Sequence, residues 1–159
     1  MRHIISVMLE NESGALSRVA GMFSARGFNI ESLTVAPTND ETLSRLTVVS
    51  VGDDNIIEQI VKQLNKIIDV VEVTDLTSFE HIERELMLIK LNVSKANLTH
   101  IMKQIETFSG KIVDASDDTY TVELAGQSKN LDEFMEKIDQ SLIIEISRTG
   151  VTGVIKGNK

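Results

Sequence analysis

The chain has 159 residues, of which 24 are acidic and 16 basic, giving a formal net charge of −8 at pH 7. This length predicts one or two small domains, and the negative charge disfavours binding to a nucleic-acid backbone. The absence of cysteine excludes disulfides, thiolate metal sites and cysteine nucleophiles. The first apolar run, residues 4–9, is too short for a membrane span and lacks the small-residue cleavage site of a signal peptide. We therefore expect a soluble, cytoplasmic protein.

The first half of the chain predicts elements in the order βαββαβ. Residues 4–9 predict a buried strand, and an apolar stripe with helical spacing predicts a helix over 14–25 that ends at Gly27. The elements that follow are strands over 28–35 and 42–51 around a turn at 37–40, a helix with Ile57, Ile60, Val61, Leu64 and Ile68 on one face, and a strand over 70–76. This order is the ferredoxin-like arrangement.

The second half repeats the same order. Its predicted elements are a strand over 86–93, a helix over 97–108, hairpin strands over 111–115 and 119–124, a helix over 131–138 and a strand over 142–147. We therefore predict an α+β fold with two ferredoxin-like domains in tandem. They cover residues 1–77 and 82–159, and the tail over 150–159 is expected to be irregular. Each domain is small for a self-sufficient core and leaves a sheet edge unpaired, which favours a homodimer with sheets joined edge to edge.

The segment between the first strand and the first helix is the most informative part of the chain. Asn11 and Ser13 are candidates to cap the helix, and Gly14 lets the backbone approach a bound group closely. A helix start carries unpaired N–H groups and can hold a small anion such as a carboxylate. No side-chain base or nucleophile stands nearby, so this site is expected to bind a small molecule without converting it. Turns of this kind also occur in many α/β domains that bind nothing there.

Other polar residues receive structural interpretations. His3, His81 and His100 lie in different predicted elements, and none has a carboxylate at metal-ligand spacing in the sequence. The acidic pairs at 53–54 and 117–118 are explained by turn chemistry. We expect no catalytic residue and no metal site in this chain.

Two N-terminal blocks resemble the small, regulatory subunit of bacterial acetolactate synthase. They are residues 1–19, MRHIISVMLENESGALSRV, and residues 26–38, RGFNIESLTVAPT. Residues 42–47 continue the resemblance and residues 120–126 echo the second domain of that family. The similarity runs from Met1 to about Gly157, which is almost the whole chain.

This resemblance implies that the first domain is an ACT domain, a βαββαβ module that pairs with a second copy and binds an amino acid at the dimer interface. In this family the ligand is valine or a related branched-chain amino acid, and a hydrophobic pocket separates valine, leucine and isoleucine only weakly. Carried over residue by residue, one chain would hold the ligand through Asn11, Gly14, Ala15 and Leu16, and the other would close the site with Asn29 and Ile30. Residues 94–98 of the second domain lack this pattern and its glycine, so no amino acid is expected there.

The resemblance further implies a noncatalytic subunit of a transferase holoenzyme in branched-chain amino-acid biosynthesis. Such a subunit binds and activates the catalytic (large) subunit of acetolactate synthase and transmits feedback inhibition by valine. No cofactor is expected in this chain, whereas the catalytic partner is expected to use thiamine diphosphate, Mg and FAD. The alternative is a stand-alone ACT-type amino-acid sensor that acts on a different partner.

Overall fold

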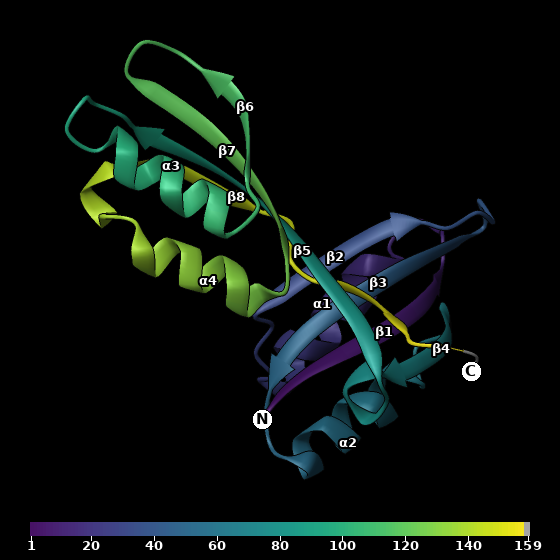
Figure 1. The fold of residues 1–159 in the computed structure, drawn as a ribbon. Helices are drawn as coiled ribbons and strands as arrows, with labels where there is room; N and C mark the ends of the chain where they lie inside the picture. Colours follow the sequence, from purple (N-terminus) through teal and green to yellow (C-terminus); the bar gives the residue numbers. More distant parts are fainter. Residues whose placement is uncertain (158–159) are drawn as a thin grey trace. The chain divides into compact units, whose positions relative to one another are not determined.

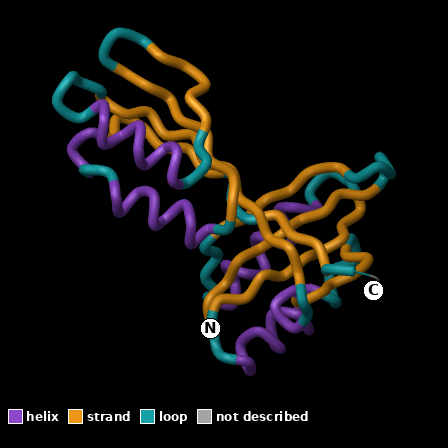
Figure 2. Tube along the Cα trace, viewed as in Figure 1, coloured by secondary structure: helices purple, strands orange, loops and turns teal. Residues whose placement is uncertain are grey.

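The computed structural model describes residues 1–157, and residues 158–159, the end of the expected tail, lie outside the described residues (Figures 1 and 2). The chain divides into two compact units. The first unit holds Met1–Ile82 together with the segment that begins at Val151, and the second unit holds Glu83–Gly150. Each unit has an antiparallel sheet with two α-helices, which confirms the predicted α+β class with two ferredoxin-like folds.

The first unit has the predicted βαββαβ order. Its elements are β1 (Arg2–Glu10), α1 (Ala15–Arg26), β2 (Ser32–Pro37), β3 (Leu43–Val51), α2 (Asp54–Leu64), β4 (Val70–Asp75) and the short 3-10 helix η1 (Leu76–Ser78). The four strands form an antiparallel sheet in the order β2-β3-β1-β4. Strand β2 therefore lies at one edge of this sheet and β4 at the other.

One face of this sheet carries the main core of the first unit. Because side chains alternate along a strand, Ile5, Val7 and Leu9 of β1 all point to the same face, where they are buried. The helices contribute the side chains that cover them, which are Val19 and Phe23 from α1 and Ile57, Ile60 and Leu64 from α2. Full burial of a large aliphatic or aromatic side chain contributes about 1.5–3 kcal/mol, so this face fixes both helices against the sheet.

The end of α1 confirms the role predicted for Gly27. This glycine adopts a left-handed conformation (φ 69°, ψ 21°), its N–H donates to the Ser24 carbonyl at 3.2 Å, and the Phe28 N–H donates to the Phe23 carbonyl at 3.0 Å. Because the Phe28 amide completes the helix end, it is not available to a strand ladder. Strand β2 accordingly begins at Ser32 and not at the expected residue 28.

The opposite face of the sheet is partly covered by the C-terminal segment, coloured yellow in Figure 1. Residues Thr152–Ile155 form strand β9, where an irregular tail was expected for 150–159. The alternation of buried Val151 and Gly153 with exposed residues gives the segment a strand period. Val151 is 2% exposed and packs in a cluster with Ile4, Val49 and Leu76. The tail therefore supplies part of the core of the first unit.

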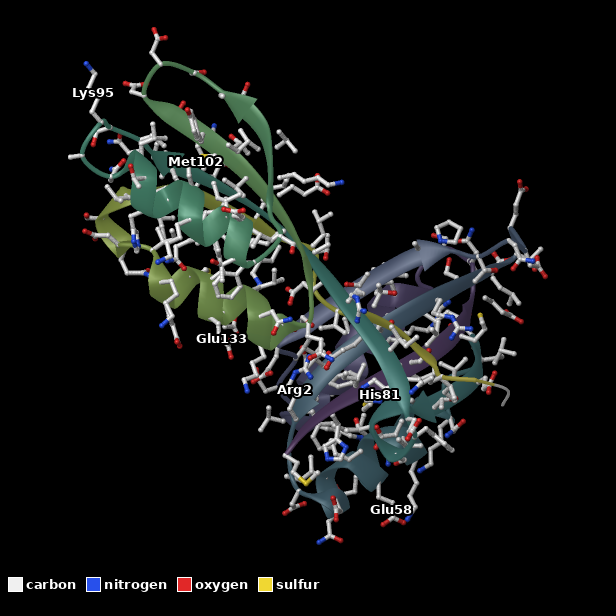
Figure 3. The ribbon with its side chains drawn as sticks, viewed as in Figure 1. Arg2, Glu58, His81, Lys95, Met102 and Glu133 are labelled. Carbon is white, nitrogen blue, oxygen red and sulfur yellow. The ribbon has the colours of Figure 1, made fainter. Side chains whose placement is uncertain are left out.

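The second unit repeats the order of elements around its own core. Its elements are β5 (His81–Asn92), α3 (Leu98–Thr107), β6 (Lys111–Ala115), β7 (Thr119–Gly126), α4 (Ser128–Lys137), the 3-10 helix η2 (Gln140–Leu142) and β8 (Ile143–Arg148). The main path of its sheet has the order β6-β7-β5-β8. Met87, Ile89 and Leu91 of β5 are buried under both helices, with Ile101, Ile105, Leu131 and Phe134 packed on them. Met102 of α3 and Glu133 of α4 are labelled in Figure 3.

A buried ion pair joins β5, β8 and α4 of the second unit. The Arg148 guanidinium donates from Nε to Glu85 Oε1 at 3.0 Å, from Nη2 to Glu85 Oε2 at 2.9 Å, and from Nη1 to Asp132 Oδ1 at 2.7 Å. Ser128 Oγ also donates to Glu85 Oε2 at 2.8 Å. Burial raises the pKa of the Glu85 carboxyl, but the hydrogen bonds from Arg148 and Ser128 outweigh burial and hold this pKa below its usual range.

Candidate effector site at the start of the first helix

Asn11 lies directly after β1 and is tied to the loop that precedes β3. Its backbone N–H donates to the Thr42 carbonyl at 2.7 Å, and its side-chain Nδ2 donates to the Glu41 carbonyl at 3.0 Å. These bonds use the backbone N–H and one of the two Nδ2 hydrogens of Asn11, and they orient its carboxamide. Oxygen Oδ1 of this carboxamide can accept a hydrogen bond from a ligand ammonium.

The first helix begins at an unusual cap. Gly14 occupies the N-cap position in a left-handed conformation (φ 86°, ψ −6°), and no side chain caps the helix. The prediction that Asn11 or Ser13 would be the cap is therefore wrong: Gly14 holds that position, and the Asn11 side chain donates to the Glu41 carbonyl. A positive φ favours glycine, so the backbone conformation explains why a glycine occupies position 14.

The amide groups at this helix start are only partly available. The Ala15 N–H donates to the Glu12 carbonyl at 3.2 Å, and the Arg18 N–H makes the first helical bond, to the Gly14 carbonyl, at 3.0 Å. The N–H groups of Leu16 and Ser17 precede the first helical bond and have no partner within the helix. An anion at this helix start would therefore meet the amides of Leu16 and Ser17, and not that of Ala15.

The Arg18 guanidinium, which was not predicted to be part of this site, lies beside Gly14. An ideal Cβ on Gly14 would lie 2.9 Å from Arg18 Nη1, so the guanidinium occupies the space that a side chain would need. Arg18 Nη2 also donates to the Asp69 carboxylate at 3.0 Å, and the hydrogen bond from Arg18 lowers the pKa of Asp69. These residues are 51 positions apart, and only the fold brings them together.

The other two predicted site residues follow the far end of α1. Asn29 is exposed, and its carbonyl accepts a hydrogen bond from Ser50 Oγ at 2.7 Å, while Ile30 is half-buried against the core. Helix α1 has 12 residues and therefore spans about 18 Å. The structure thus brings Asn11, Gly14, Ala15 and Leu16 together, with Ala15 buried and Leu16 40% exposed. It leaves Asn29 and Ile30 at the opposite end of the helix in the same chain.

The histidines of the described residues take part in structural contacts. The fold places Asp75 Oδ2 at 3.1 Å from His3 Nδ1, a carboxylate partner that sequence spacing did not reveal. His81 contacts the Phe79 carbonyl and His100 contacts the Lys137 carbonyl, each at 2.9 Å. Within residues 1–157 no group of three or more histidine or acidic side chains is arranged to hold a metal ion. In the same range no helix is long and apolar enough to cross a membrane.

The two ferredoxin-like units, the first with a helix that starts at Gly14, have the architecture of ACT-type regulatory proteins. Residues 5–72 match the model of the AHAS small subunit-like ACT domain, and residues 84–157 match the model of the small subunit of acetolactate synthase. The chain belongs to the family of acetolactate synthase small subunits. Family membership makes it a regulatory subunit of a holoenzyme and implies a large catalytic subunit as its partner.

Individual relatives are similar in sequence to this chain over its full length. The acetolactate synthase isozyme 3 small subunit of Escherichia coli strain K12 is 52% identical over 160 residues, covering 100% of this chain and 98% of that protein. The small subunit of Haemophilus influenzae is 49% identical over 160 residues, again covering 100% of this chain and 98% of the relative. The crystal structure of the acetolactate synthase small subunit from Thermotoga maritima matches with a TM-score of 0.90 at 36% identity, covering 100% of this chain and 99% of that one.

Proposed function

We propose that this chain binds and activates the thiamine-diphosphate-dependent catalytic subunit of acetolactate synthase and confers feedback inhibition by valine or another branched-chain amino acid. Magnesium and FAD are proposed for the catalytic partner and not for this chain. The effector site consists of Asn11, Gly14, Ala15 and Leu16 of one chain, with Asn29 and Ile30 from a second copy.

The chemistry of the helix start supports an amino acid as the ligand. The amides of Leu16 and Ser17 are suited to the ligand carboxylate, at the positive end of the α1 dipole. The Arg18 guanidinium lies beside Gly14 and is held there by its ion pair with Asp69, and Asn11 Oδ1 is suited to the ligand ammonium. The half-exposed Leu16 side chain is available to cover an apolar ligand side chain.

The observation that carries the two-chain site is the separation along α1. Asn11–Leu16 and Asn29–Ile30 lie at opposite ends of a helix about 18 Å long, so one chain does not line a single small pocket with both groups. Asn29 and Ile30 lie just before β2, which begins at Ser32 and is an edge strand with unpaired backbone groups. If β2 pairs antiparallel with β2 of a second copy, Asn29 and Ile30 of each chain come toward Asn11–Leu16 of the other chain.

Two measurements test this proposal on the full chain. Isothermal titration with valine, leucine and isoleucine is expected to show saturable binding of at least one of them, with one ligand for each chain. Acetolactate formation by the purified catalytic subunit is expected to rise when the chain is added, and to fall again when that amino acid is supplied. Binding without any effect on the catalytic subunit would instead favour a sensor that acts on another partner.

A further inference from the structure

The Arg18 guanidinium lies at the end of α1 where a positive charge is least favourable. Side chains on an α-helix lean toward its N-terminus, and Arg18 follows this rule, because its Nη2 donates to the carbonyl of Ser13, one residue before the cap Gly14, at 3.4 Å. The N-terminal end of a helix carries a partial positive charge, so a basic side chain directed there is repelled. A specific contact must therefore hold the guanidinium in this place.

Asp69 supplies that contact. Arg18 Nε donates to Asp69 Oδ2 and Nη2 donates to Oδ1 at 3.0 Å, so the carboxylate binds one edge of the planar guanidinium through two parallel hydrogen bonds. The Asp69 side chain is 7% exposed, and the Asp69 backbone carbonyl accepts from the N–H of Glu10, the last residue of β1, at 2.8 Å. Asp69 is thus anchored to the sheet, and it fixes the orientation of the Arg18 side chain.

The third nitrogen of the guanidinium remains for another partner. Within residues 1–157 the hydrogen bonds of the Arg18 side chain are made by Nε and Nη2, and Nη1 keeps its two N–H donors. Nη1 lies beside Gly14, 2.9 Å from the position that a Cβ would take there. The Arg18 side chain is 48% exposed, so it is accessible to a small molecule at the helix start.

We propose that Arg18 Nη1 donates to the carboxylate of the amino acid bound at this helix start, and that Asp69 is the positioning residue that directs Arg18 there. This inference rests on the effector site proposed above. The guanidinium then bridges two carboxylates, with Asp69 on one edge and the ligand on Nη1, while the amides of Leu16 and Ser17 bind the same ligand group. Because Asp69 balances the charge of Arg18, the contribution of Arg18 is directional hydrogen bonding to an anion and not an excess of positive charge.

This arrangement makes Arg18 a residue that determines specificity. A hydrogen bond to a charged oxygen is roughly twice as strong as one between neutral groups. A carboxamide offers one neutral oxygen in place of the two charged oxygens of a carboxylate, so Nη1 gains less from it. The site therefore favours free amino acids over amino acids that are amidated or joined in a peptide bond.

Calorimetric titration of the full chain with L-valine and with L-valinamide tests this role. Valinamide has the ammonium and the side chain of valine but a neutral amide in place of the carboxylate. The measured quantity is the ratio of the two dissociation constants, and the wild-type chain is expected to favour valine. Arg18→Met is expected to weaken valine binding roughly ten- to a hundredfold and valinamide binding much less, so the ratio falls.

Matched variants separate ligand binding from a purely structural role. Arg18→Met leaves the Asp69 carboxylate without its cation, whereas the double variant Arg18→Met/Asp69→Asn removes both charges and keeps the balance. We expect the double variant to be folded and to keep the low ratio of Arg18→Met. Asp69→Asn alone releases the guanidinium and is expected to lower the ratio partly. Lys62→Met, which breaks an exposed pair with Glu58 on α2 (Figure 3), is the control and leaves both affinities unchanged. Urea denaturation of each variant shows that it is folded.

Two results would overturn the role of Arg18. A wild-type ratio in Arg18→Met would show that the helix amides bind the ligand carboxylate alone. A wild-type ratio in the double variant would show that Arg18 only balances the charge of Asp69. A wild-type chain that binds none of valine, leucine and isoleucine is a different result, because it contradicts the proposed effector site itself and the role of Arg18 with it.

Discussion

The two units share a topology but differ where the first strand gives way to the first helix. In the first unit the helix starts at Gly14, which has no side chain, and Arg18 stands four residues later against it. In the second unit the corresponding cap is Asn97, whose side chain bonds within its own loop, accepting from the Ser94 N–H at 2.7 Å and donating to the Asn92 carbonyl at 3.3 Å. The residue four positions after Asn97 is Ile101, which is buried in the core.

This difference shows that the fold and the site are separable features of the chain. In the first unit this strand–helix connection holds a glycine with the Arg18 guanidinium beside it, whereas in the second unit it holds the Asn97 side chain and the buried Ile101. In the proposed function, effector binding depends on the residues at the helix start and not on the ferredoxin-like arrangement itself. We accordingly assign the effector to the first unit alone.

The largest expected effect comes from placing a negative charge at the first helix start. A carboxylate in Gly14→Asp would lie about 4 Å from the ligand carboxylate, which costs on the order of 4 kcal/mol at an effective dielectric near 20. Valine affinity is therefore expected to fall roughly a thousandfold, as measured by isothermal titration. Activation of the catalytic subunit is expected to remain.

Two control variants separate charge from shape. Gly14→Asn has nearly the same size as Gly14→Asp and tolerates the positive φ of this position, but adds no charge, so its loss of affinity should be clearly smaller. Asn97→Asp places the same new charge at the helix start of the second unit and should leave valine affinity unchanged. Equal losses in all three variants would contradict the distinction between the two loops.

Local sequence signals predicted the parts of this site that depend on neighbouring residues. Gly27 ends α1 as expected, and Gly14 was singled out as a glycine between a predicted strand and a predicted helix, although its left-handed conformation was not predicted. The pairing of Arg18 with Asp69 spans 51 positions and has no local signature. For the same reason the return of Val151 to the sheet of the first unit was not predicted, since a short apolar segment near a chain end does not show which surface it will cover.

The second-largest effect concerns stability and is confined to the second unit. Arg148→Met leaves the Glu85 carboxylate buried without its cation, so we expect the free energy of unfolding to fall by about 2–3 kcal/mol. Lys90→Met is the matched control, because Lys90 pairs with the exposed Glu145 at 3.6 Å and should contribute less than about 1 kcal/mol. Urea denaturation measures both. Valine affinity that falls with Arg148→Met would show that the second unit shapes the effector site.

The same ion pair predicts a pH dependence with a definite sign. The pKa of Glu85 is lowered in the folded chain, so the carboxylate contributes stability above its unfolded pKa. That contribution is lost as the pH falls through the folded pKa. The difference in unfolding free energy between the wild-type chain and Arg148→Met is therefore expected to be largest at neutral pH and to become smaller under acidic conditions. A difference that grows on acidification would contradict this assignment.

The smallest expected effect tests whether the C-terminal segment belongs to the first unit. Val151→Ala removes buried methyl groups from the cluster with Ile4, Val49 and Leu76, and should lower stability by about 1–2 kcal/mol. Val154→Ala in the same C-terminal segment removes the same atoms from a side chain that is 53% exposed, and should change stability by less than about 0.5 kcal/mol. Thermal unfolding of the two variants provides the comparison. Equal melting temperatures would show that the segment does not contribute to the core.

In the proposed effector site, the residues at the two ends of α1 come from two different chains. The most direct measurement is valine binding to a mixture of Gly14→Asp and Asn29→His chains, with subunit exchange followed by native mass spectrometry. Each heterodimer would contain one site with both lesions and one site with none. Random exchange is then expected to restore roughly a quarter of the wild-type number of sites, although neither variant alone binds valine tightly. Heterodimers that form but recover no binding would contradict the two-chain site and show that the effector binds within a single chain.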